Sequence, residues 1–228
     1  MAKQQQKSRG DSTRQALIMA AIEIFGRDGF HAASTREIAR EAEANQAAIG
    51  YHFGGKDALY LAAIEHISER ITERIGPITQ EIIVQLDVLE NPETDAKKVR
   101  EKCLNLLLKL MNGMLRMLVG QESSSWAKLI LREQQSPTPA FDVFYKGLMG
   151  QALHITTVLV AKVRDLHPQS EEARLLAITV VGQVIVFRAS RAMVLRYMEW
   201  PDFSEKQAEV IQEQIEQNII AMLSHGEK

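Results

Sequence analysis

Apolar residues recur along most of this chain at the three- and four-residue spacing of amphipathic helices. The first apolar stripe comprises Leu17, Ala20, Ala21, Ile24 and Phe25, and Gly29 ends it. The same spacing predicts further helices over residues 35–42, 46–53, 56–76, 77–90, 95–119, 122–135, 140–166, 170–198 and 204–223. No stretch alternates apolar and polar residues as a half-buried β-strand does. We therefore predict an all-α protein of nine or ten helices.

A Gly76-Pro77 pair interrupts the long helical pattern that begins at Lys56. Proline lacks the amide hydrogen that a helix uses, and its ring clashes with the preceding turn. The pair therefore marks either a kink or a boundary between two helices, and we predict a boundary.

The most informative stretch is residues 34–59. Ser34 and Glu37 have the spacing of a capping box, which predicts a helix that begins at Thr35. Asn45 is a strong N-cap residue, so another helix is expected to open only three or four residues after the first one ends. Two short helices joined by so tight a turn are typical of the helix-turn-helix of DNA-binding proteins.

The segments T-R-E-I-A-R-E-A and N-Q-A-A-I-G-Y-H-F-G-G-K-D-A-L resemble the DNA-binding domain of the TetR family of repressors over residues 14–61. Two positions depart from the family pattern. Glu43 replaces the glycine of the turn, which predicts a left-handed backbone at a non-glycine residue. Gly50 replaces an asparagine or tyrosine and removes one potential DNA contact. The later run L-R-E-Q-Q-S-P-T-P-A-F resembles the CecR-like subgroup of the family, which is connected with antibiotic sensitivity.

The resemblance implies a three-helix DNA-binding domain over residues 12–61 and a helical ligand-binding and dimerisation domain over residues 62–228. Residues 1–11 are polar and lack apolar periodicity, which predicts a disordered arm and no signal peptide. We expect a cytoplasmic, homodimeric transcriptional regulator. It would repress by binding a palindromic double-stranded DNA operator, and a small amphiphilic effector would release it.

The net charge of −2 is unusual for a DNA-binding protein until it is divided along the chain. Residues 1–56 hold 8 Lys and Arg against 6 Asp and Glu, whereas residues 57–228 hold 19 against 23. The helix-turn-helix end is therefore the positive end, as contact with phosphates requires.

The DNA-contacting residues follow from the position of the second short helix. Gln46 lies at its first turn and is expected to bond N6 and N7 of an adenine in the major groove. Arg36 matches a family position that reaches guanine or phosphate. The other predicted contact residues are Thr35, Asn45, Ala47, Ala48, Tyr51, His52, Gly55 and Lys56.

The middle helices hold an unusually soft, aromatic-rich set of side chains, and methionine adapts to ligands of varied shape. Plain core packing is the alternative for any one of them, and the resemblance favours a pocket for the set. The predicted ligand-binding residues are Met111, Met114, Leu118, Trp126, Leu129, Ile130, Glu133, Phe141, Phe144 and Tyr145. Ligand is expected to act by shifting the helix that begins at Lys56 about Gly76-Pro77.

The run from Leu175 to Phe187 is almost continuously apolar, but at 13 residues it is too short to span a membrane. The resemblance implies that the last two helices pair with those of a second subunit in a four-helix bundle; the alternative is that both complete a monomer core. The predicted dimer residues are Ile178, Val181, Ile185, Ile211, Ile215 and Ile219.

Catalytic and metal-binding patterns are weak. Ser125 and Lys128 fit the S-x-x-K pattern of serine acyl enzymes, but the accompanying S-D-N and K-T-G motifs are missing. The six histidines lack metal-ligand spacing, and the single cysteine, Cys103, lies in an apolar helix. We predict neither an enzyme nor a metal or cofactor site. A helical protein-interaction module is the alternative function, followed by a serine acyl enzyme.

Overall fold

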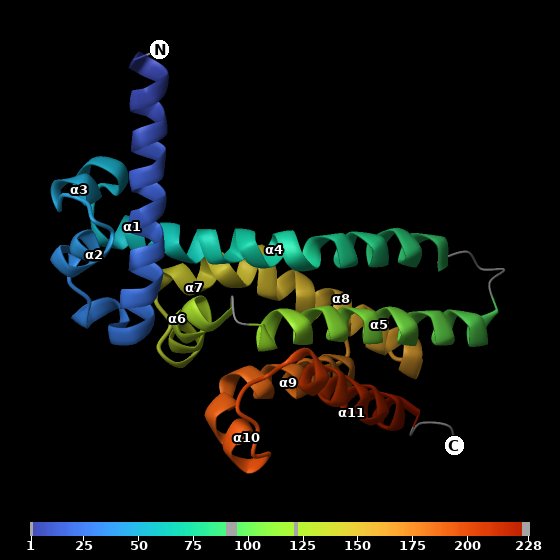
Figure 1. Ribbon diagram of the computed structural model, residues 1–228. Coiled ribbons are helices and arrows are strands. Elements are labelled where there is room, and N and C mark those ends of the chain that lie inside the picture. The colour runs from blue at the N-terminus through green and yellow to red at the C-terminus, as the bar shows by residue number, and fades with distance from the viewer. Residues whose placement is uncertain (1, 90–94, 121–122, 225–228) are drawn as a thin grey trace. The chain divides into compact units, whose positions relative to one another are not determined.

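The computed structural model describes residues 2–89, 95–120 and 123–224 (Figure 1). All regular elements in these ranges are helical, which confirms the predicted all-α class. The elements are α1 (Ala2–Ala32), α2 (Thr35–Glu41), α3 (Ala47–Phe53), α4 (Lys56–Leu89), α5 (Ala96–Val119), α6 (Ser123–Gln135), α7 (Pro139–Phe144), the π-helical turn η1 (Tyr145–Met149), α8 (Gly150–Arg164), α9 (Glu171–Ala189), α10 (Arg191–Tyr197) and α11 (Glu205–Ser224).

The chain divides into two compact units. The first unit holds the residues up to Arg70 together with Ser123–Gly147, and the second holds Ile71–Glu122 and the residues from Leu148 onward. The sequence pattern and the family resemblance predict a single change of domain after residue 61. Instead, α6 and α7 fold together with the helix-turn-helix helices, although α5 separates them in sequence.

Helices α2 and α3 lie beside α1 in the first unit (Figure 1). The apolar spacing of these helices predicts a shared core of six side chains, Phe25, Phe30, Ile38, Ile49, Phe53 and Leu59. Four of them are buried and two, Phe30 and Phe53, are half-buried. The buried four are Phe25, Ile38, Ile49 and Leu59. The ring of Phe25 also meets that of Tyr60 edge to face, at 4.8 Å between centroids.

Helix α1 begins at Ala2, where the sequence analysis expected a disordered arm over residues 1–11 and a helix start at Ser12. Lysine, glutamine and arginine are good helix formers, so the helix can extend outward from the packed stripe that begins at Leu17. The predicted end at Gly29 is confirmed by its φ of +83°. Helical hydrogen bonding resumes beyond it for one short turn.

Helix α4 is continuous, with Pro77 inside it, so the predicted boundary at Gly76-Pro77 is wrong. Proline removes one amide donor, but the buried stripe passes straight through the site. Ile71, Ile75 and Ile82 are all buried at helical spacing on either side of it. Packing of this face outweighs the lost hydrogen bond.

The second unit is built around α5, which contacts α8, α9 and α11. Its buried side chains include Leu107, Leu110 and Met111. Gly113 lets α4 approach closely, because an added Cβ would overlap Cδ1 of Ile78.

The sequence analysis expected one helix over residues 170–198, but α9 and α10 meet at an angle of 77°. Ser190 leaves the helical region between them, with φ −108° and ψ 28°. Arg191 then pairs with Asp202 and lies 4.9 Å from the centroid of the Phe203 ring, which holds α10 to the following loop. These contacts are tertiary, so no local breaker marks the bend. The expected helix over residues 140–166 is likewise interrupted by η1.

Replacing Pro77 by alanine tests the continuity of α4. An alanine restores the missing amide donor, so Pro77→Ala should stabilise the protein by about 1–3 kcal/mol, measured by denaturant unfolding. The matched control is Pro139→Ala, because Pro139 occupies the first turn of α7, where proline is favourable. The control should be neutral or mildly destabilising. A destabilised Pro77→Ala variant would show that α4 needs a break there.

Candidate nucleic-acid interface and effector site

The turn between α2 and α3 has the conformation that the sequence predicted. Glu43 has φ +50°, a left-handed backbone at a non-glycine residue. The amide of Ala44 donates to the carbonyl of Ala39 at 2.8 Å, and that of Ala42 donates to Ile38. These bonds close the end of α2 and turn the chain sharply into α3.

The start of α2 differs from the expected capping box. Ser34 occupies the N-cap position, but its side chain makes no capping hydrogen bond. The carboxylate of Glu37 instead accepts a bond from Arg27 at 2.9 Å and lies 3.5 Å from Arg40. An ion pair between helices thus replaces the local cap and ties α2 to the end of α1.

The start of α3 is capped as expected, because Oδ1 of Asn45 accepts a hydrogen bond from the amide of Ala47 at 2.9 Å. The side-chain nitrogen Nε2 of Gln46 lies 3.5 Å from the hydroxyl oxygen of Thr35, so these two predicted DNA-contacting side chains are neighbours. Within α3, Ile49 is buried, whereas Ala47, Gly50 and Tyr51 are exposed. The outer side of α3 is therefore presented by a helix whose other side is anchored in the core.

All ten residues predicted to contact DNA belong to the first unit, and none of them is buried. Tyr51 is 86% exposed, and its ring meets that of His52 at 4.9 Å between centroids. The exposed members are Arg36, Asn45, Gln46, Ala47 and Tyr51, and the half-buried ones are Thr35, Ala48, His52, Gly55 and Lys56.

The start of α4 is marked by a glycine pair and by the contacts of Lys56. Gly54 and Gly55 have φ values of +82° and +154°, which side-chain-bearing residues rarely adopt, so the glycine pair is required by the backbone. The ammonium of Lys56 donates to the carbonyl of His31 at 3.2 Å and lies 4.9 Å from the Phe30 ring centroid. The Lys56 ammonium therefore already makes contacts within the first unit.

Two adjacent residues of α6 attach this helix to the first unit; we call Arg132, Glu133 and their partners the α6 anchor. Glu133 is only 1% exposed. One carboxylate oxygen accepts a bond from the Tyr60 hydroxyl, and the other accepts bonds from the amide and hydroxyl of Thr138, both at 3.2 Å. Burial and the neighbouring Glu133 carboxylate raise the pKa of Tyr60 well above its ordinary value, so the phenol remains the donor.

Arg132 completes the α6 anchor. Its guanidinium donates to the carbonyls of Gly26 at 2.9 Å and Arg27 at 2.6 Å, close to the point where Gly29 disrupts α1. Both carboxylate oxygens of Glu133 therefore accept hydrogen bonds within the first unit. The role of Glu133 in binding a ligand stays a prediction.

The remaining nine residues predicted to bind a ligand lie on elements of both units. Phe141 and Tyr145 stack within the first unit, at 6.0 Å between ring centroids. Buried members are Met111, Leu129, Ile130 and Phe144; half-buried ones are Met114, Leu118, Trp126 and Phe141; Tyr145 is exposed. Their role in binding a ligand stays a prediction.

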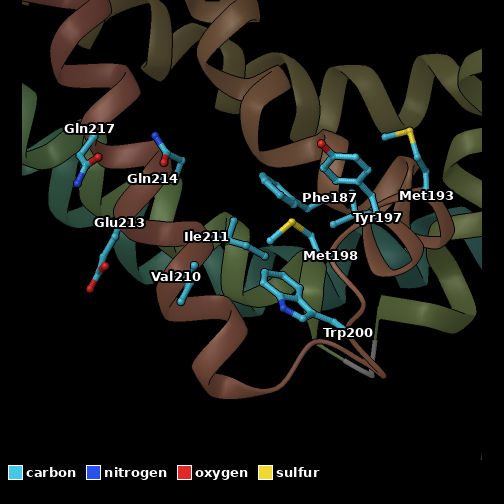
Figure 2. Close-up of a pocket in the computed structure, with 11 residues that line it drawn as sticks. Phe187, Met193, Tyr197, Met198, Trp200, Val210, Ile211, Glu213, Gln214 and Gln217 are labelled. Atoms are coloured by element: carbon cyan, nitrogen blue, oxygen red, sulfur yellow. The ribbon is translucent and has the colours of Figure 1, made fainter.

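A cavity of about 720 Å³ lies between α9, α10 and α11 of the second unit, and the sequence analysis missed it (Figure 2). Its lining includes Phe187, Met193, Tyr197, Met198 and Trp200. The sequence does contain an aromatic and methionine-rich run before Pro201. The helical spacing predicts a straight helix for this run, because the bend at Ser190 has no local marker.

The residues predicted to form the dimer contact divide into two groups. Val181, Ile211, Ile215 and Ile219 are buried inside the second unit, so they belong to the chain's own core. Ile178 is 57% exposed and Ile185 is half-buried. Exposed apolar side chains that the prediction omitted are Leu175 and Val186 on α9 and Val210 and Ile220 on α11.

The described residues contain no group of three or more His, Cys, Asp or Glu side chains that could hold a metal ion. Cys103 is buried, and burial raises the pKa of its thiol, which disfavours the reactive thiolate. Lys128 is exposed on α6. The side chain of Ser125 lies outside the described part of the structure, so the S-x-x-K pair has no described geometry.

No single helix among the described residues is long and apolar enough to cross a bilayer. Helices α9 and α10 would reach the required length only together, and they are bent by 77°.

Family models match both parts of the chain. Residues 17–63 match the model of bacterial regulatory proteins of the tetR family, and residues 104–225 match the C-terminal domain of the HTH-type transcriptional dual regulator CecR. The second model alone covers more than half of the chain. This chain belongs to the TetR family. It is therefore a DNA-binding transcriptional regulator, and the resemblance to the CecR-like subgroup is confirmed.

A curated relative agrees along nearly the whole length. The transcriptional dual regulator CecR of Shigella flexneri is 30% identical over 207 residues, which are 91% of this chain and 89% of that protein. These matches point to transcriptional regulators and not to enzymes.

Solved structures show the same fold at lower identity. A TetR-like regulator from Rhodococcus sp. RHA1 has a TM-score of 0.63 at 21% identity, covering 93% of this chain and 96% of that one. AibR in complex with isovaleryl coenzyme A and operator DNA has a TM-score of 0.59 at 16% identity, covering 92% and 97%.

The α6 anchor generates a stability prediction. Tyr60→Phe removes the phenol donor and leaves a buried carboxylate oxygen unbonded, which should cost about 1–3 kcal/mol in denaturant unfolding. The matched control is Tyr51→Phe, because the Tyr51 side chain is exposed. The control should change stability by less than about 0.5 kcal/mol. Equal effects in the two variants would contradict the role assigned to Glu133.

Proposed function

We propose that this TetR-family regulator binds a near-palindromic operator through the outer side of α3 in each subunit of a homodimer, and that a small effector releases it. One observation carries the proposal. Gln46, which immediately precedes α3, and Ala47, Gly50 and Tyr51 within it are open to solvent, while Ile49 is buried in the core.

Base recognition is assigned to the first turn of α3. A glutamine there can bond both N6 and N7 of an adenine, and its side-chain nitrogen lies 3.5 Å from the Thr35 hydroxyl, so the two side chains are neighbours. Arg36, exposed on the first turn of α2, is assigned to a guanine or a phosphate.

Backbone contacts are assigned to the end of α3 and the start of α4. Tyr51 and His52 offer exposed or half-exposed polar groups, and the left-handed Gly54 and Gly55 leave the first amides of α4 accessible to a phosphate. Such contacts set the position of the protein on DNA but carry little sequence information.

The dimer contact is assigned to the exposed apolar faces of α9 and α11. Of the dimer residues predicted from the sequence, Ile178 is kept because it is exposed. The other exposed apolar side chains on these two helices are Leu175, Val186, Val210 and Ile220. Several large apolar side chains exposed on neighbouring helices are typical of an interaction surface. A twofold dimer explains how short recognition helices reach sufficient specificity, because two half-sites are read together.

Effector release requires different effector affinities of the DNA-bound and DNA-free states. The AibR neighbour, whose structure is in complex with isovaleryl coenzyme A and operator DNA, supports the binding of both a small ligand and DNA by this fold. We propose an amphiphilic effector, because the candidate pocket residues are mainly apolar with few polar groups.

The assignment of Gln46 predicts a change in base preference. On DNA selected by the wild-type protein, Gln46→Ala should lose about 1–3 kcal/mol of discrimination at one adenine per half-site. The control, Lys56→Ala, should weaken binding to all sequences alike. Fluorescence anisotropy with single-base substitutions measures both. An unchanged preference in Gln46→Ala together with an altered one in Lys56→Ala would reverse the assignments.

The dimer surface predicts different outcomes for an exposed and a buried isoleucine. Ile178→Glu should yield folded monomers that lose specific DNA binding, because the charge falls at the contact. Ile215→Glu should unfold the second unit, because it buries a charge without a partner. Sedimentation and circular dichroism separate these results. Intact dimers of Ile178→Glu would place the contact elsewhere.

A further inference from the structure

The end of α1 is interrupted shortly before α2 begins. Gly29 has φ +83° and ψ 168°, so the regular part of α1 stops at this residue. The last carbonyls of a helix have no amide partner within the helix. Gly26 and Arg27 lie in the last turn before the break, and their carbonyl oxygens are therefore available to donors from other parts of the chain.

Arg132 of α6 supplies these donors. Figure 1 shows α6 beside this end of α1. Nε of Arg132 donates to the carbonyl of Gly26 at 2.9 Å, and Nη2 donates to that of Arg27 at 2.6 Å. A β-carbon at Gly29 would lie only 3.2 Å from Nη1 of Arg132, so the glycine also leaves room for the guanidinium. Because a cation is favourable at the C-terminal end of a helix, Arg132 stabilises this one conformation of the end of α1.

The side chain of Arg27 continues these contacts to α2. Its guanidinium donates to the carboxylate of Glu37, in the first turn of α2, at 2.9 Å. Thr35 and Arg36, two of the predicted DNA-contacting residues, belong to the same turn. Nε2 of Gln46 lies 3.5 Å from the Thr35 hydroxyl. A series of contacts thus leads from α6 through the end of α1 to the side chains assigned to DNA.

We propose that Arg132 is a positioning residue for operator binding. It holds the end of α1 so that Arg27 can fix the direction of α2 through Glu37, and it makes no contact with DNA itself. The inference rests on the proposed reading of an operator by α3. It adds a residue of α6, distant in sequence from the helix-turn-helix, to those that determine operator affinity.

Glu133 allows this role to be separated from folding. Its carboxylate is buried and accepts bonds from Tyr60 and Thr138, and none of these bonds involves Arg132. Helix α6 should therefore stay attached to the first unit when Arg132 is replaced. Circular dichroism and denaturant unfolding establish that each variant is folded at the temperature of the binding assay.

The first test compares Arg132→Gln with Lys128→Gln. Lys128 is exposed one helical turn earlier on α6, so its replacement removes the same charge without touching α1. Fluorescence anisotropy measures the ratio of the dissociation constants for the selected operator and for a non-specific duplex of equal length. Arg132→Gln should reduce operator preference about three- to tenfold, as expected for a residue that acts without contacting the ligand. Lys128→Gln should leave it unchanged. Equal preferences of the two variants would overturn the proposal.

The salt dependence of operator binding tests whether Arg132 contacts a phosphate. Each lost phosphate contact lowers the slope of log Kd against log salt concentration by about one. A positioning residue leaves this slope unchanged, because the same phosphates are neutralised once the complex forms. A slope lowered by about one per subunit in Arg132→Gln would make Arg132 a DNA contact and overturn the proposal.

The route through α1 is tested by combining Arg132→Gln with Arg27→Gln. If both residues act through the same contacts, the double variant should show an operator preference within about twofold of that of the more affected single variant. Losses that multiply would show independent action and contradict the route. Should Arg132→Gln unfold, Arg27→Gln alone decides, because it must also reduce operator preference at least about threefold.

The wild-type protein distinguishes this inference from the proposed function. A wild-type protein without preference for any selected sequence would overturn the proposed function and the role of Arg132 with it. A clear wild-type preference that Arg132→Gln retains in full would overturn the role of Arg132 alone.

Discussion

A single buried carboxylate determines how the DNA-binding unit is composed. Glu133 is removed from solvent, and an uncompensated charge there would be very unfavourable. Hydrogen bonds from Tyr60 and Thr138 compensate it, and the adjacent Arg132 caps carbonyls near the end of α1. These bonds join α6, α1 and α4, so the helices that position α3 are packed with a segment that lies far from them in sequence.

This composition bears on how a ligand signal can reach DNA. Helix α4 passes from the first unit into the second without a break, and α6 belongs to the first unit although α5 belongs to the second. The backbone therefore links the two units at several points. An effector can change DNA affinity only to the extent that it binds the two states of the protein differently. The hydrogen bonds of Arg132 and Glu133 are discrete contacts that two such states could make or break.

The sequence predicted the elements whose signals are local. The Asn45 cap and the buried Ile38 and Ile49 follow from residue type and spacing. The resemblance, which identified the family from the same stretch, implied the left-handed backbone of Glu43. What failed depended on tertiary contacts. Packing keeps α4 helical through Pro77, and contacts of Arg191 with Asp202 and Phe203 accompany the bend at Ser190. The dimer residues stay a prediction, because an apolar stripe does not reveal whether it faces its own core or a partner.

The central claim is that two copies of α3 read an inverted repeat. Selection of bound sequences from random double-stranded oligonucleotides tests it most directly. The account predicts enrichment of a near-palindromic site whose half-site centres lie about one helical turn, or a multiple of it, apart, with an adenine in each half. Enrichment of an asymmetric site, or no enrichment above non-specific binding, would contradict it.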